Sequence, residues 1–83
     1  MAFYVYMLKS ITSKSKKTYV GYTKDIKRRL ELHNNSKGAK FTKGFKWVII
    51  YKKKFKDKNS AMSYEFKLKN DKKKRLTLYN KSL

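Results

Sequence analysis

The chain has 83 residues, of which 40% are hydrophobic and 16% aromatic, which is enough for one modest core and excludes a disordered basic tail. Its 24 Lys plus Arg against 5 Asp plus Glu give a formal net charge of +19. A polyanion is the expected partner, because each basic side chain that meets a phosphate releases counterions. No cysteine is present, which excludes disulfides and thiolate metal sites. The alternative origin of the charge is a genome that prefers lysine codons.

The sequence does not indicate a membrane protein. It contains no apolar run long enough for a transmembrane helix, and no signal peptide is visible at the N-terminus. No predicted helix combines a broad apolar face with a basic one, so binding to an anionic membrane surface is the least favoured alternative. We therefore expect a cytoplasmic protein.

The first part of the chain predicts a hairpin followed by a helix. Aromatic and branched residues predict strands over residues 3–8 and 18–22, joined by a polar loop. Thr23 is the predicted N-cap of the helix, and Asp25 lies in its first turn. We expect this helix to end near His33.

The second part predicts one more strand and two helices. A glycine-containing loop over 34–44 leads to a strand over 47–51, and a charged connection follows over 52–59. We expect a helix over 60–70 and a third short helix or tail over 72–78. The order β-β-α-β-α-α predicts an α+β fold, a small three-stranded antiparallel sheet flanked by helices.

The first predicted helix carries two basic residues on its apolar face. With Ile26 at zero on an ideal helix, Leu30 lies at about 40°, His33 at about −20° and Arg29 at about −60°. A charged group on a buried face costs free energy unless another group pairs with it. Arg29 is therefore a candidate functional residue. The alternative is that its guanidinium reaches solvent along the aliphatic stem.

The second predicted helix places a carboxylate in the same kind of position. With Ala61 at zero, Leu68 lies at about −20° and Glu65 at about 40°, on the side of the core. One interpretation is a ligand for a hard divalent cation, since Mg²⁺ is usually held by one or two carboxylates together with water and phosphate. The other is a buried glutamate paired with a nearby lysine or arginine.

Tyrosines recur on the predicted strands. Because side chains alternate along a strand, Tyr4, Tyr6 and Leu8 share one face, and Tyr19 and Gly21 share a face of the next strand. A glycine inside a strand often marks close approach by a ligand or another backbone. Taken alone, the tyrosines are more typical of core packing than of catalysis.

Two tripeptides and two helical residues resemble a known family. Residues 4–6 (Tyr-Val-Tyr) and 19–21 (Tyr-Val-Gly) resemble the GIY and YIG segments of the GIY-YIG nuclease superfamily. The helical arginine of that family lies eight positions after the glycine, where this chain has Arg29. His33 occupies the position four residues later, where a histidine is common.

The C-terminal half extends the resemblance. Residues 61–69 (AMSYEFKLK) resemble the A-x-x-x-E-x-x-L-K segment of the family, whose glutamate is Glu65 here, and Asn80 corresponds to a downstream asparagine. The match spans about residues 4–80 and is closest to the short bacterial members that consist of the nuclease domain alone. These are similar to the nuclease domain of structure-specific endonucleases, which implies one nuclease domain over 1–83. Tyr4 departs from the motif, because it stands where the first glycine of GIY would be.

The resemblance implies a metal-dependent endonuclease that hydrolyses phosphodiester bonds in DNA. Glu65 would hold one Mg²⁺ or Mn²⁺ ion. Tyr6 would help to activate the water, as general base or within a relay, and Tyr19 would orient the water or the scissile phosphate. Arg29 would bind the phosphate and its developing charge with its fork of donors. His33 would hydrogen-bond a tyrosine or the leaving group.

An ordinary tyrosine is a poor base at neutral pH, because its pKa is about 10. We therefore hypothesise that Arg29, nearby lysines and the metal ion lower the pKa of Tyr6.

The remaining basic residues are predicted to contact the nucleic-acid backbone. Four lysines lie in or beside the loop after the first helix, interleaved with aromatic residues that could stack on unpaired bases. They are Lys37, Lys40, Lys43 and Lys46, and Asn80 is assigned to the same role. The alternative is that Phe45 and Trp47 belong to the core and that the lysines are merely solvated.

The expected partner is DNA, with branched, nicked or single-stranded forms as candidate substrates, and RNA remains an alternative. We expect little sequence specificity and a steep salt dependence, because no sequence-reading module is present. A non-catalytic basic protein that binds DNA or RNA is the main alternative. It would explain the charge, but not Arg29 and Glu65 on apolar helix faces. Any protein partner is unknown.

Overall fold

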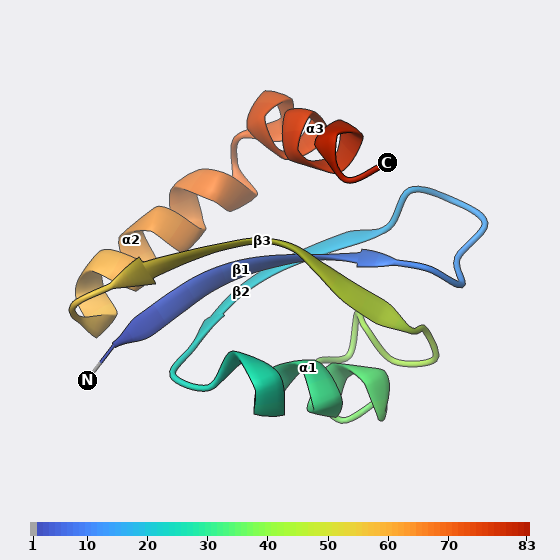
Figure 1. The fold of residues 1–83 in the computed structure, drawn as a ribbon, viewed down its shortest axis with the longest axis horizontal. Coiled ribbons are helices and arrows are strands. Elements are labelled where there is room, and N and C mark those ends of the chain that lie inside the picture. Colours follow the sequence, from blue (N-terminus) through green and yellow to red (C-terminus); the bar gives the residue numbers. More distant parts are fainter. Residues whose placement is uncertain (1) are drawn as a thin grey trace.

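The computed structural model describes residues 2–83, so position 1 of the predicted domain lies outside the described residues. It forms one antiparallel sheet with helices on both faces, as Figure 1 shows. The elements are β1 (Phe3–Ser10), β2 (Thr18–Thr23), α1 (Ile26–Asn34), β3 (Trp47–Phe55), α2 (Lys58–Lys69) and α3 (Lys72–Lys81). The predicted α+β fold and the order β-β-α-β-α-α are confirmed.

The sheet has the strand order β2-β1-β3, so that β1 is central and the other two strands form the edges. The predicted hairpin pairs Tyr6 with Gly21 across β1 and β2. A register shift between Met7 and Leu8 interrupts the pairing of β1 with β3. A β-bulge of this kind bends the strand and increases its twist.

The prediction that residues 52–59 form a connection is wrong for the first four of them. Lys52, Lys53 and Lys54 continue β3 and pair with β1, and the strand ends only at Phe55. Lysine has a low strand propensity, but the ladder to β1 overrides it here. At the exposed edge of a sheet, lysines also discourage pairing with another chain.

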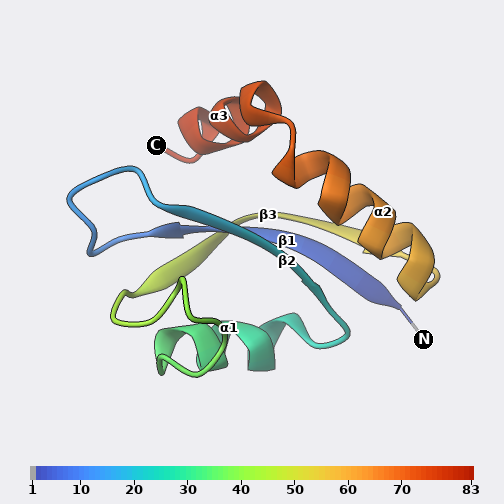
Figure 2. The same ribbon diagram turned by 180° about the vertical axis from the view of Figure 1, so that it is seen from behind.

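Each face of the sheet has its own core. On one face, Val5, Met7 and Val20 pack against Ala61 and Leu68 of α2. On the opposite face, the buried residues are Tyr6, Leu8 and Trp47, against which Leu30 of α1 packs. Figures 1 and 2 show the same arrangement, with α1 on one side of the sheet and α2 and α3 on the other.

Aspartates set the start of every helix. The side chain of Asp25 accepts a hydrogen bond from the backbone N–H of Arg28, so the predicted N-cap at Thr23 is wrong by two residues. The Thr23 hydroxyl instead accepts from the N–H of Asp25. Asp57 and Asp71 cap the other two helices in the same way. Consequently α2 begins at Lys58 rather than residue 60, while α3 runs to Lys81, three residues beyond the expected end.

Within residues 2–83, no helix combines the length and the apolar character that crossing a membrane requires.

Candidate active site

An open pocket lies beside the outer edge of β2, between α1 and α2. Its volume is about 690 Å³, within the range of small-molecule sites. Four of the predicted site residues line it. They are Tyr6 and Tyr19 from the sheet, Arg29 from α1 and Glu65 from α2. The pocket is also cationic, since Lys24, Arg28 and Lys58 line it as well.

The glycine of β2 makes room for Tyr6 to reach this pocket. A Cβ atom at Gly21 would lie 2.6 Å from the Tyr6 hydroxyl oxygen and 3.1 Å from the ring of Tyr19. The expectation of a close approach at Gly21 is therefore met, but by a tyrosine side chain rather than by a ligand or a backbone. Any side chain at position 21 would push the phenol out of its place.

His33 lies behind Tyr6 rather than in the pocket wall. Its Nε2 is 2.8 Å from the Tyr6 hydroxyl oxygen, and its Nδ1 is 2.9 Å from the hydroxyl oxygen of Thr42. His33 and Thr42 are both fully buried. Of the two contacts expected for His33, a tyrosine and the leaving group, this structure contains the tyrosine contact.

Burial governs the ionisation of this pair. It raises the pKa of Tyr6 well above its usual range, with a further rise from neighbouring Tyr19, and Arg29 lowers this pKa by less. Arg29 thus lowers the pKa of Tyr6 as hypothesised, but burial outweighs it, so the net shift in the protein alone is upward. Burial, followed by the charge of Arg29, also lowers the pKa of His33. At neutral pH the pair is therefore a neutral phenol and a neutral imidazole.

Arg29 is half-buried at the pocket and is not used in an ion pair. Within residues 2–83, the sole ion pair of the structure joins Glu65 and Lys69, so no carboxylate neutralises the Arg29 guanidinium. Its donors are consequently free for an anion in the pocket, and a phosphate would match their planar geometry.

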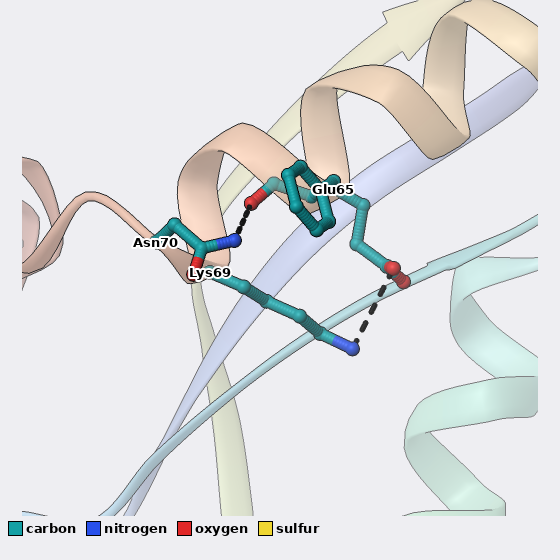
Figure 3. Close-up of polar contacts among 4 residues, drawn as sticks. Glu65, Lys69 and Asn70 are labelled. Atoms are coloured by element: carbon teal, nitrogen blue, oxygen red, sulfur yellow. Dashed lines mark hydrogen bonds and ion pairs between the residues drawn. The ribbon is translucent and has the colours of Figure 1, made fainter.

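Glu65 is the pocket's candidate metal ligand. Its side chain is 17% exposed, and the Lys69 amine lies 3.5 Å from its carboxylate, one helical turn away (Figure 3). The alternative of a glutamate paired with a lysine is therefore realised, but such i,i+4 pairs contribute only about 0.3–0.5 kcal/mol. A metal ion that binds Glu65 therefore has to displace only this weak ion pair with Lys69.

The donor set of the pocket fits a hard cation that keeps most of its water. No group of three or more His, Cys, Asp or Glu side chains lies together in the described part of the chain, so the protein offers no complete cage. Mg²⁺ is commonly bound through one or two carboxylates plus water and substrate phosphate. Glu65 meets that requirement, because it lines an open pocket in which Arg29 can bind a substrate phosphate.

The predicted nucleic-acid contacts lie outside the pocket. Lys37, Lys40, Lys43 and Lys46 are exposed along the segment between α1 and β3. The Lys46 amine donates to the carbonyl oxygen of Asn34. Asn80 is exposed on α3, which covers the opposite face of the sheet from α1 (Figure 1).

The aromatic residues near these lysines divide into two groups. Trp47 is buried and Phe45 packs against it, so both belong to the core, as the alternative held. Phe41 is 51% exposed and its ring stacks on Tyr19 at a centroid distance of 6.4 Å. The Lys17 amine lies 4.9 Å from the centre of the Phe41 ring. An exposed ring thus stands beside a residue of the pocket.

Three residues that the sequence did not single out belong to this region: Lys17, Gly38 and Thr42. A Cβ atom at Gly38 would lie 2.5 Å from the Nδ1 of His33. Gly38 therefore lies against the imidazole ring. A threonine and a glycine in a polar loop carry no periodic signal, so their contacts appear only in three dimensions.

Known proteins resemble this chain in sequence and in fold. Residues 2–80 match the model of the GIY-YIG catalytic domain, so the chain belongs to that family. Membership implies a nuclease that acts on nucleic acid.

Its relatives include small bacterial UPF0213 proteins. The chain is 39% identical over 67 residues to UPF0213 protein OB0043 of Oceanobacillus iheyensis. The aligned residues cover 80% of this chain and 74% of the relative. The chain is 49% identical over 55 residues to a UPF0213 protein of Streptococcus pneumoniae serotype 4, covering 65% of this chain and 56% of the relative. The solution structure of UPF0213 protein BH0048 from Bacillus halodurans has the same fold. BH0048 is 34% identical to this chain, and the two structures match with a TM-score of 0.53. The match covers 96% of this chain and 84% of BH0048.

Proposed function

We propose that the chain is a metal-dependent endonuclease that hydrolyses phosphodiester bonds in DNA with little sequence specificity, and that residues 1–83 form its nuclease domain. The observation that carries the proposal is the presence of Tyr6, Tyr19, Arg29 and Glu65 in the wall of one open pocket. Phosphodiester hydrolysis needs a proton acceptor, an anion-binding group and charge neutralisation at the phosphate. These side chains supply that combination.

Each residue has a role set by its surroundings. Arg29, which lacks a carboxylate partner in residues 2–83, binds the scissile phosphate and the charge that develops on it. Tyr6, backed by His33, accepts the proton of the attacking water. Tyr19, beside both rings, orients the water or the phosphate. Bound through Glu65, Mg²⁺ or Mn²⁺ would stabilise charge at the phosphate and the leaving oxygen.

The DNA is proposed to run from the pocket along the segment that carries the four lysines, with Lys37 and Lys40 as backbone contacts. Phe41 offers a surface on which an unpaired base can stack next to the pocket, because its ring is half exposed and held against Tyr19. This favours substrates with a branch, a nick or a single-stranded segment over continuous duplex.

A cleavage assay tests the proposal. Purified protein is incubated with branched, nicked, duplex and single-stranded DNA in Mg²⁺, Mn²⁺ or EDTA. We expect metal-dependent nicking that is abolished in Arg29→Ala and Glu65→Gln. Glu31→Gln is the matched control, because Glu31 is exposed on α1 and is not a helix N-cap.

Two results would contradict it. Tight DNA binding with no nicking in any metal or substrate would favour a non-catalytic binding protein. Nicking that survives Glu65→Gln and Arg29→Ala would assign the chemistry to another site.

A further inference from the structure

We propose that Thr42 is a positioning residue that fixes the tautomer of His33, so that Nε2 of the ring is the acceptor for the proton of Tyr6. The inference rests on the proposed nuclease function for its catalytic meaning. The direction of the hydrogen bonds, however, follows from the geometry alone. Thr42 lies in the segment between α1 and β3 and does not line the pocket.

The hydroxyl group of Thr42 has a single proton to donate. Its oxygen lies 2.9 Å from the carbonyl oxygen of Ala39 and 2.9 Å from Nδ1 of His33. A carbonyl oxygen can only accept, so the hydroxyl must donate to Ala39. The same hydroxyl oxygen then accepts from His33, which places the ring proton on Nδ1.

That assignment determines the other side of the ring. A neutral imidazole with its proton on Nδ1 has a bare Nε2. Nε2 lies 2.8 Å from the hydroxyl oxygen of Tyr6, so Tyr6 donates to it. The result is a one-way chain of hydrogen bonds from Tyr6 through His33 and Thr42 to the carbonyl of Ala39.

The surroundings keep the chain in this arrangement. His33 and Thr42 are both fully buried, so water cannot readily replace either partner. Thr42 is held through its carbonyl, which accepts from the Trp47 indole at 3.0 Å. Gly38 lies against the imidazole so closely that an added methyl would meet Nδ1 at 2.5 Å. The ring therefore has little room to turn over.

The chemical consequence concerns the Tyr6 oxygen. With its proton committed to His33, that oxygen can present a lone pair to a water molecule in the pocket. As the water oxygen bonds to phosphorus, its proton passes to Tyr6 and the Tyr6 proton passes to Nε2. The bond from phosphorus to the leaving oxygen breaks, and that oxygen keeps the electron pair and takes a proton from water in the open pocket. In the opposite tautomer Nε2 would carry a proton, and Tyr6 could not transfer its own to the ring.

The experiment is a nitrogen-detected NMR measurement of the imidazole, which is unambiguous because the chain has one histidine. In the wild type at neutral pH we expect a protonated Nδ1 and an unprotonated Nε2. Thr42→Ser keeps the hydroxyl and should keep this pattern. Thr42→Val removes the acceptor and should mix or reverse the tautomers. Thr77→Val, on the exposed surface of α3, is the control for losing a threonine hydroxyl bonded to a backbone carbonyl.

Cleavage by the same variants provides the second readout. We expect Thr42→Val to lower kcat about 10- to 100-fold with little change in KM, as is typical when the partner that orients a functional histidine is lost. Thr42→Ser should stay near the wild-type rate.

A wild-type spectrum with the proton on Nε2 would overturn the inference. So would wild-type cleavage by Thr42→Val. If Thr42→Val does not fold, the spectra of the wild type and of Thr42→Ser still test the inference, because both should show the ring proton on Nδ1. If the wild type has the expected tautomer but cuts no DNA, the nuclease proposal fails while the tautomer assignment stands.

Discussion

Two neighbouring effects shift the pKa of Tyr6 in opposite directions. Burial makes the phenolate costly, whereas the nearby guanidinium of Arg29 favours it, and burial is the larger effect. A free phenolate is therefore absent at neutral pH, so Tyr6 can act as a base only if its proton leaves as another arrives. The hydrogen bond to His33 gives that proton a destination 2.8 Å away.

Tyr6→Phe removes the hydroxyl while keeping the ring. Loss of general-base catalysis typically lowers rates about 10²- to 10⁴-fold, and we expect kcat to fall within that range with little effect on KM. Steady-state kinetics on a nicked or branched substrate measure both constants. Cleavage at the wild-type rate would show that Tyr6 does not accept the proton.

Gly21→Ala tests the space that admits Tyr6. The new methyl would lie 2.6 Å from the Tyr6 hydroxyl oxygen, so the phenol must move. Overpacking of this kind costs about 1–3 kcal/mol, and the moved hydroxyl should lose contact with Nε2. Chemical denaturation gives the stability and a nicking assay gives the activity. An alanine variant with unchanged stability and rate would contradict the close packing.

The lowered pKa of His33 predicts a pH dependence of stability. The unfolded chain protonates its histidine near the ordinary pKa of 6.5, whereas the folded chain resists protonation because the ring is buried and near Arg29. Below about pH 6.5 the unfolded state therefore binds more protons, and the free energy of unfolding falls as the pH is lowered. Urea denaturation at pH 7.5 and 5.5 measures the change. In His33→Gln, the free energy of unfolding should differ less between the two pH values than in the wild type. An equal difference in the two proteins would contradict the lowered pKa of His33.

At the scale of elements, helix boundaries depend on the few acidic residues. Apolar patterning predicted the order of the strands and the first two helices and left residues 72–78 as a helix or tail. The two predicted helix starts differ by two residues from those observed. Asp25 and Asp57 are the N-caps of α1 and α2, because each side-chain oxygen accepts a hydrogen bond from a free backbone N–H in the first turn. A neighbouring threonine or serine looks equally suitable in the sequence, and only the backbone path distinguishes them.

The site was predictable to the extent that helix geometry sets it. Arg29 and Glu65 were found because each breaks the apolar face of a helix, and both line the pocket. Thr42 escaped detection because its contact with His33 depends on how an irregular loop folds back. Asn80 has no such geometric signal, and its assigned role stays a prediction.

The loop between α1 and β3 gives a prediction of its own. Phe41→Ala should weaken binding to single-stranded DNA by about 1–3 kcal/mol, the usual contribution of one stacked base, with a smaller effect on duplex. Phe66→Ala is the matched control, because Phe66 is 69% exposed on α2 and does not line the pocket. Fluorescence anisotropy with catalytically inactive Glu65→Gln protein measures both. Equal losses on the two DNA forms would argue against stacking.

At the scale of the whole molecule, the charge of +19 predicts strongly salt-dependent binding. If the protein neutralises about 6–10 phosphates, its affinity for duplex DNA should fall about 10³- to 10⁵-fold between 50 and 200 mM salt. A titration over that range gives the slope of log K against log salt. A flat profile would mean that the lysines take little part in binding.

The lysines of β3 have a consequence for how copies of the protein behave toward one another. Lys52, Lys53 and Lys54 project from an edge strand whose outer hydrogen-bonding groups face no neighbouring strand of the sheet. Their mutual repulsion keeps two such edges apart. Replacing all three with threonine, a good strand former, would let the β3 edges of two copies pair with each other. The protein would then aggregate at high concentration before its fold was affected.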